Sequence, residues 1–164
     1  MIFITVGTHE QPFNRLLRYM DRYIDETKTK EWIVCQSGYS TYIPKNYKTE
    51  KFTKFEQMQD YLESARIVIT HGGPSSFIPV LAKGRIPIVV PREKIFNEHV
   101  NDHQKDFCRK VNEEKGQFIL CTNYEEFRDA LLNYEKRSKI MQSGFKPHNA
   151  EFCKELDNKI EELL

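Results

Sequence analysis

The sequence predicts an α/β fold, a single doubly wound domain built on a mostly parallel sheet. Short apolar, β-branched runs alternate along the chain with longer segments whose apolar residues repeat at helical spacing. The 164 residues suit one domain with one sizeable core, and no linker, repeat or low-complexity tract divides them. Strands that alternate with helices form parallel sheets covered on both faces, so we expect residues 1–164 to fold as one unit.

The expected elements follow from local pattern and from caps. Gly84 is suited to end one helix and Asn123 to begin another. The helix expected at the end of the chain has an apolar face that would pack on its own domain, on a partner protein or on a second copy. Predicted strands occupy residues 2–6, 32–35, 49–52, 67–69, 86–90 and 118–121, and predicted helices occupy residues 13–24, 55–64, 75–83, 99–114, 123–132 and 149–164.

Composition is that of an ordinary folded protein. Hydrophobic residues make up 39% and charged residues 30%, which is too apolar for a disordered chain. A net charge of +1 gives no reason to expect binding to nucleic acid or to an anionic membrane surface. The sequence shows no apolar run near the roughly 18–20 residues that span a bilayer and no basic leader, so we expect a cytoplasmic protein.

Four cysteines, Cys35, Cys108, Cys121 and Cys153, are spread along the chain. None of them forms the C-x-x-C spacing of metal or redox sites. We therefore expect reduced thiols, some of them buried as small apolar side chains.

The most informative loop is 70–76, Thr-His-Gly-Gly-Pro-Ser-Ser, which follows a predicted strand. Its two glycines let the backbone approach a ligand, and its serines begin the next helix. A helix N-terminus offers free N–H groups and a partial positive charge, which favour a diphosphate, and His71 can donate a further hydrogen bond. The alternative is a glycine-rich turn with a helix cap. Neither the dinucleotide nor the P-loop fingerprint is present.

Two other loops should reach the same edge of the sheet, at residues 7–12 and 91–104. In the second, Arg92 and Lys94 are suited to offset phosphate charge. His99 and His103 lie four residues apart, but no third ligand is evident, so we predict no metal site. The alternatives are an ordinary strand-to-helix turn for the first loop and solvated polar residues at a helix start for the second.

In combination these motifs resemble the C-terminal domain of family 28 glycosyltransferases. The resemblance lies in the 70–76 loop, in Pro87-Ile88-Val89-Val90-Pro91-Arg92 and in His99-x-Asn101-Asp102-His103-Gln104, and it covers residues 2 to about 132. It implies a Rossmann-like domain equivalent to the C-terminal half of a GT-B enzyme. The start of the chain is similar to subunits of split UDP-sugar transferases, both the eukaryotic UDP-N-acetylglucosamine type and the bacterial capsule or exopolysaccharide type. The motifs Pro91-Arg92 and 98–104 resemble those of the bacterial type more closely.

The resemblance implies a division of labour between two proteins. This chain would hold a UDP-sugar, which is a substrate, and would need no cofactor or metal. A membrane-associated glycosyltransferase partner would bind the lipid-linked saccharide acceptor and bring the chain to the inner face of the membrane. The 71–76 loop would contact the diphosphate, and residues 101–104 the sugar or ribose. The expected UDP-sugar-binding residues are Gly7, Thr8, His71, Gly72, Gly73, Pro74, Ser75, Ser76, Arg92, His99, Asn101, Asp102, His103 and Gln104.

One residue departs from the family pattern. Many relatives carry a ribose-binding glutamate where this chain has Pro79, so ribose recognition must differ or depend on the partner. Glu10 and Asp102 are the only carboxylates in the loops that suggest a base, and we assign no catalytic residue. Two rival functions follow: a non-catalytic enhancer that stabilises a partner transferase, and a UDP-sugar epimerase of related fold, which the short chain disfavours.

Overall fold

The computed structural model describes residues 1–141 of the chain. The helix predicted at 149–164 and Cys153 lie outside these residues, so the docking of that helix stays a prediction. Within the described part, no helix is long and apolar enough to cross a bilayer.

A six-stranded sheet forms the centre of the domain, and all its strand pairs are parallel. The strand order β3-β2-β1-β4-β5-β6 is that of a doubly wound, Rossmann-like fold. The predicted fold class is therefore confirmed, with a wholly parallel sheet. The strands are β1 (Ile2–Thr5), β2 (Ile33–Gln36), β3 (Thr49–Glu50), β4 (Ile67–His71), β5 (Ile88–Val90) and β6 (Ile119–Leu120).

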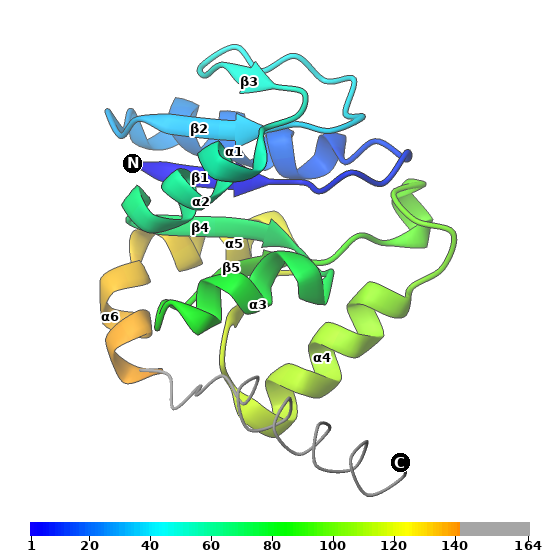
Figure 1. Cartoon of the computed structure of the whole chain (residues 1–164), viewed down its shortest axis with the longest axis vertical. Coiled ribbons are helices and arrows are strands. Elements are labelled where there is room, and N and C mark those ends of the chain that lie inside the picture. Colours follow the sequence, from blue (N-terminus) through cyan, green and yellow to red (C-terminus); the bar gives the residue numbers. More distant parts are fainter. Residues whose placement is uncertain (142–164) are drawn as a thin grey trace, which may run out of the picture.

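Helices cover both faces of the sheet (Figure 1). Helices α1, α5 and α6 pack on one face, and α2, α3 and α4 pack on the other. This arrangement follows from the parallel pairing, because parallel strands need crossover connections, and all of these except the one from β2 to β3 carry a helix onto one face. The helices are α1 (Asn14–Thr27), α2 (Phe55–Ser64), α3 (Pro74–Ala82), α4 (His103–Lys115), α5 (Tyr124–Leu132) and α6 (Tyr134–Ile140), with a short 3-10 helix η1 (Lys94–Phe96).

Side chains of the central strands alternate between the two faces. In β1, Ile4 packs among residues of α1 and α5, whereas Phe3 packs against α2 and α3. Both are fully buried, so the strand is apolar on both sides, as expected for a covered parallel sheet. Cys35, Cys108 and Cys121 are buried free thiols, as predicted for part of the set; Cys35 and Cys121 belong to the core on the α1 side and Cys108 to the core beneath α3 and α4.

The segment between β5 and α4 departs most from the predicted boundaries. The helix expected from about residue 99 begins only at His103, and η1 precedes it. Asn97 ends η1 in the left-handed conformation, and the Asp102 carboxylate accepts a hydrogen bond from the Lys94 amide at 2.8 Å. The polar residues that suggested an early helix start therefore shape a compact loop.

The predicted caps agree with the structure, and one helix was missed. Gly84 follows α3 with a φ of 71°, and the Asn123 side chain accepts a hydrogen bond from the Glu126 amide at 2.9 Å. Helix α6 was not predicted, because its seven residues carry too few apolar side chains to show a helical stripe.

The topology places a crevice between β1 and β4. From β1 the chain continues to β2 and β3 on one side, and the later strands lie on the other. Ligands of doubly wound sheets bind at such a switch point, outside the carboxyl ends of the strands. In Figure 1 the loops after β1 and β5 leave the strand arrowheads at the same edge of the sheet.

Candidate functional site

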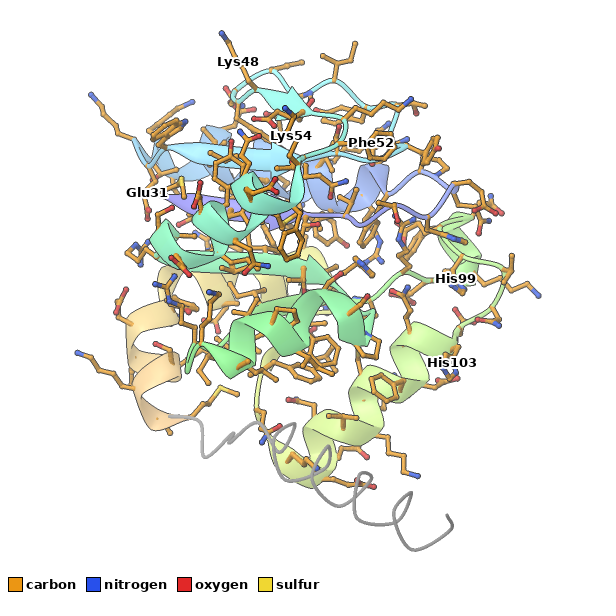
Figure 2. The ribbon with its side chains drawn as sticks, viewed as in Figure 1. Glu31, Lys48, Phe52, Lys54, His99 and His103 are labelled. Atoms are coloured by element: carbon orange, nitrogen blue, oxygen red, sulfur yellow. The ribbon has the colours of Figure 1, made fainter. Side chains whose placement is uncertain are left out.

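A cleft of about 800 Å³ opens at this edge, within the range of roughly 300–1,000 Å³ typical of small-molecule sites. Its walls come from the loop after β1, the loop after β4 and the segment that follows β3. Figure 2 shows Phe52, from this third wall, and His99 on the same edge of the sheet. The lining residues are Thr5, Gly7, Thr8, His9, Glu10, Gln36, Phe52, Thr53, Met58, His71, Ser75 and Ser76.

Five of the predicted binding residues line this cleft: Gly7, Thr8, His71, Ser75 and Ser76. They come from the loops after β1 and β4, which meet as the parallel topology requires. These two loops therefore form one continuous site, although they are more than sixty residues apart in the sequence.

The His71 ring lies between two glycines. A Cβ atom at either Gly7 or Gly73 would clash with the ring, so both positions need a residue without a side chain. Gly7 also has a φ of 78°, a conformation that L side chains rarely adopt. Gly72 faces the other way, toward Cys108 of α4, so this glycine serves packing and does not line the cleft.

The hydrogen bonds of His71 indicate which ring nitrogen carries the proton. Its Nδ1 accepts from the Gly73 amide at 2.9 Å, and its Nε2 lies 2.6 Å from the Ser76 hydroxyl. Burial, with the nearby charge of Arg92, lowers the pKa of His71 to about 4, so the ring is neutral at physiological pH. Since Nδ1 is an acceptor, Nε2 carries the proton and donates to Ser76 Oγ. The Ser76 hydroxyl can then donate its own proton into the cleft.

The N-terminus of α3 adds further donors at the same wall. Pro74 occupies the first helical position, where its lack of an N–H costs no helix hydrogen bond. Ser75 and Ser76 both line the cleft. The Ser76 amide donates to the Gly73 carbonyl at 2.9 Å, so the donors at this end of the helix are the two serine hydroxyls and the Ser75 amide. Together with the positive end of the helix dipole, this arrangement is suited to an anion such as a phosphate.

The opposite wall contains residues that the sequence interpretation did not identify. Gln36, at the end of β2, accepts a hydrogen bond from Thr5 at 2.7 Å and donates one to the Gly7 carbonyl at 3.0 Å. Phe52 and Thr53 follow β3 and complete the wall. The available signal was positional: β2 and β3 precede the switch point, so the ends of these strands also reach the cleft edge.

None of the predicted binding residues of the 91–104 loop is among the residues that line the cleft. Asp102 binds the Lys94 amide, and the Asn101 side chain accepts a hydrogen bond from the His103 amide at 3.1 Å. Gln104 accepts from the Arg92 amide at 3.3 Å. Their side chains therefore stabilise the fold of the loop itself.

His99 is the member of this loop that lies nearest the cleft. Its ring stacks on the ring of His9, a cleft residue, with 4.8 Å between centroids. The Asn101 side chain lies 3.0 Å from His99 Nδ1 and holds this ring in place. His99 thus closes one end of the site from outside its lining. No group of three potential metal ligands occurs among residues 1–141.

Arg92 is not at the cleft surface, contrary to the prediction that it binds phosphate. Its side chain is fully buried, and its guanidinium donates to the main-chain carbonyls of Val6, Gln11 and Glu98 at 2.7–2.9 Å. Burial lowers the pKa of Arg92 to about 10, so it remains charged at neutral pH. The charge of Arg92 therefore reaches the site only through space, where it helps to lower the pKa of His71.

An ion cluster fixes the 91–104 loop from within. Arg15 of α1 pairs with Glu98 at 2.7 Å and lies 3.7 Å from Glu93, which in turn binds Lys105 at 2.5 Å. Burial disfavours the charge of Arg15, but its hydrogen bonds with Glu98 outweigh this and raise the pKa of Arg15. Glu93 and Glu98 therefore pair with basic side chains of the protein itself and are not free to act in the cleft.

Pro79 lies beside the cleft. It lines a smaller cavity of about 200 Å³ between α2 and α3, together with Phe55, Met58 and Leu62. Because Ser75 and Ser76 line both cavities, the smaller one adjoins the cleft. Among residues 1–141, no acidic side chain lines this smaller cavity, so the described part of the site offers no carboxylate there for ribose hydroxyls.

Comparison with known proteins gives a consistent result. The model of the glycosyltransferase family 28 C-terminal domain matches residues 1–117, which include all the cleft residues. The chain is 31% identical over 127 residues to the UDP-N-acetylglucosamine transferase subunit ALG13 of Mus musculus, and 28% identical over 130 residues to that of Homo sapiens. These alignments cover 73% and 74% of this chain but only 10% and 11% of the two relatives.

Proposed function

The chain belongs to the family of glycosyltransferase family 28 C-terminal domains, and from this premise we propose that its cleft binds the UDP-sugar donor of a two-component glycosyltransferase. The observation that carries the proposal is the anion-binding wall formed by Ser75, Ser76 and the N-terminus of α3. The name of the mammalian relatives specifies a UDP-N-acetylglucosamine transferase subunit, which supports a UDP-hexose as donor.

The proposed reaction moves a hexose from UDP to a hydroxyl of a lipid-linked saccharide, in the synthesis of a capsular or exported polysaccharide. The bond from the anomeric carbon to the diphosphate breaks, and a glycosidic bond to the acceptor oxygen forms. The leaving diphosphate takes up negative charge, which the dipole of α3 and the Ser76 hydroxyl are placed to stabilise. The proton of the acceptor hydroxyl passes to a base.

A partner protein is proposed to supply that base and the acceptor site. Glu10 is the one carboxylate among the cleft residues, and its side chain is 80% exposed and lies 3.5 Å from His9. A side chain this exposed is held in no fixed position, so Glu10 is a poor candidate for a catalytic base, which must be positioned against the proton it takes. The partner would also hold this chain at the inner face of the membrane, which agrees with the word subunit in the relatives' name.

Calorimetric titration with UDP, UMP and UDP-N-acetylglucosamine tests the proposal. We expect UDP to bind more tightly than UMP, because the second phosphate reaches the α3 N-terminus. Ser76→Ala should weaken UDP binding about tenfold, or ~1.4 kcal/mol, through loss of one hydrogen bond to a charged ligand. Ser64→Ala on α2, whose hydroxyl donates to the Asp60 carbonyl and which does not line the cleft, is the matched control. No UDP binding by the chain, alone or with its partner, would contradict the proposal.

Pro79 favours a second candidate, a non-catalytic enhancer. Among residues 1–141, the cavity beside Pro79 has no carboxylate in its lining, which weakens the case for tight nucleotide binding by this chain alone. The two functions differ in a reconstituted complex. If Ser76→Ala lowers transfer activity in proportion to its effect on UDP binding, the chain holds the donor. If the variant supports full activity, the chain acts as an enhancer.

A further inference from the structure

Arg92 has the largest fully buried side chain in the described part of the molecule, and it is charged. A buried guanidinium is costly unless its donors are satisfied. Here the terminal nitrogens bind three main-chain carbonyls, and the guanidinium carbon lies 4.9 Å from the centre of the Phe13 ring. Only Nε lacks an acceptor among these residues.

The three acceptors share a structural role. Val6 comes immediately before the cleft wall formed by residues 7–10, and Gln11 comes immediately after it. One guanidinium therefore holds both ends of this wall. The third acceptor, Glu98, belongs to the loop before α4 and precedes His99, which stacks on His9 of the same wall.

We propose that Arg92 is a positioning residue, which fixes the 7–10 wall of the cleft by bridging Val6, Gln11 and Glu98. The consequence for donor binding rests on the proposed function; the consequence for the wall does not. Arginine suits the task because its planar fork reaches several carbonyls at once, whereas lysine offers one compact ammonium group. Arg92 acts on a ligand through the wall, without touching it.

The chain contains a matched control for this role. Arg85 also donates to three main-chain carbonyls, those of Leu62, Glu63 and Ala65 at the end of α2. These residues precede β4, and none of them lines the cleft, although Leu62 lines the smaller cavity beside it. Loss of the guanidinium at Arg85 removes the same kind of interaction without releasing a cleft wall.

The experiment compares Arg92→Lys and Arg92→Met with Arg85→Lys and Arg85→Met in the full-length chain. Hydrogen exchange is measured by mass spectrometry, UDP affinity by calorimetry and the melting temperature by scanning fluorimetry. In the Arg92 variants we expect faster exchange in peptides covering residues 6–12 and 97–99, and UDP binding weaker by about tenfold or more. In the Arg85 variants we expect faster exchange near residues 62–66, a similar loss of melting temperature and UDP affinity within about twofold.

The outcomes separate the proposal from a purely stabilising role. Unchanged exchange at residues 6–12 in a folded Arg92→Lys variant would overturn it. So would a loss of UDP affinity that tracks melting temperature equally at both arginines. If Arg92→Met does not fold, Arg92→Lys decides. If the unmodified chain binds no UDP, the proposed function fails, and the exchange comparison alone then decides whether Arg92 fixes the wall.

Discussion

The loops after β4 and β5 are both polar segments predicted to bind the donor, but their side chains are used differently in the structure. Both leave the same edge of the sheet, both carry histidine and both lead into a helix. The 71–76 loop exposes its donors to the cleft, whereas Arg92, Glu93 and Glu98 of the other loop are buried and bind one another or the main chain. Polar side chains at a sheet edge therefore do not by themselves mark a binding surface, because those that satisfy each other are removed from it.

The largest effect is expected from a substitution in the buried ion cluster of the 91–104 loop. Glu98→Gln removes the charge that pairs with Arg15, and both side chains are less than a tenth exposed. The buried charge of Arg15 then keeps only the more distant Glu93, which it shares with Lys105, so we expect the free energy of unfolding to fall by about 3 kcal/mol. Urea denaturation measures it. Glu63→Gln, in the exposed pair with Lys83, should cost less than about 0.5 kcal/mol, and equal losses would show that the cluster is not special.

The cleft side should respond to a single methyl group. Gly73→Ala introduces a Cβ that clashes with the His71 ring, although the φ of −78° at Gly73 suits alanine. We expect UDP binding to weaken about 30-fold, or ~2 kcal/mol, because the ring can no longer orient Ser76. Calorimetry measures this. Gly84→Ala, where a Cβ meets nothing within 4 Å, should lower stability through its positive φ and leave UDP affinity unchanged.

The stability of the protein should depend on pH because His71 is neutral in the folded state. The folded pKa of about 4 lies below the ordinary value of 6.5, so between these values the unfolded chain binds a proton that the folded chain does not. Stability contributed by this site is therefore nearly complete above pH 6.5 and falls as the pH drops toward 4, by about 2.5 kcal/mol at pH 4.5. In His71→Asn, denaturation curves from pH 7 to 4.5 should show a correspondingly smaller loss. An identical loss in both proteins would argue against a buried neutral ring.

The smallest effect is expected at the exposed start of α4. His103 is exposed, does not line the cleft, and contributes its amide to the Asn101 side chain. His103→Ala should change UDP affinity by less than about twofold, in contrast to the prediction from sequence that His103 binds the donor. A tenfold loss by calorimetry would restore the 91–104 loop to the binding surface and remove the contrast between the two loops.

The parts of the site that sequence predicted well are those with a strong local cause. A pair of glycines followed by proline and serines, after an apolar strand, specifies a turn into a helix N-terminus without reference to the rest of the chain. Phe52 and Gln36 were missed because nothing local marks them. Their place in the cleft depends on β2 and β3 pairing beside β1, which is a long-range event.

The sequence by itself determined the alternation of strands and helices, the caps at Gly84 and Asn123, and the glycine-rich turn between β4 and α3. These features depend on side-chain periodicity and on backbone preferences within a few residues. Only the tertiary structure decided where Arg92 points and which polar loop faces the cleft. A guanidinium can donate to a phosphate or to a carbonyl, and here the folded loops bring three main-chain carbonyls within reach of Arg92.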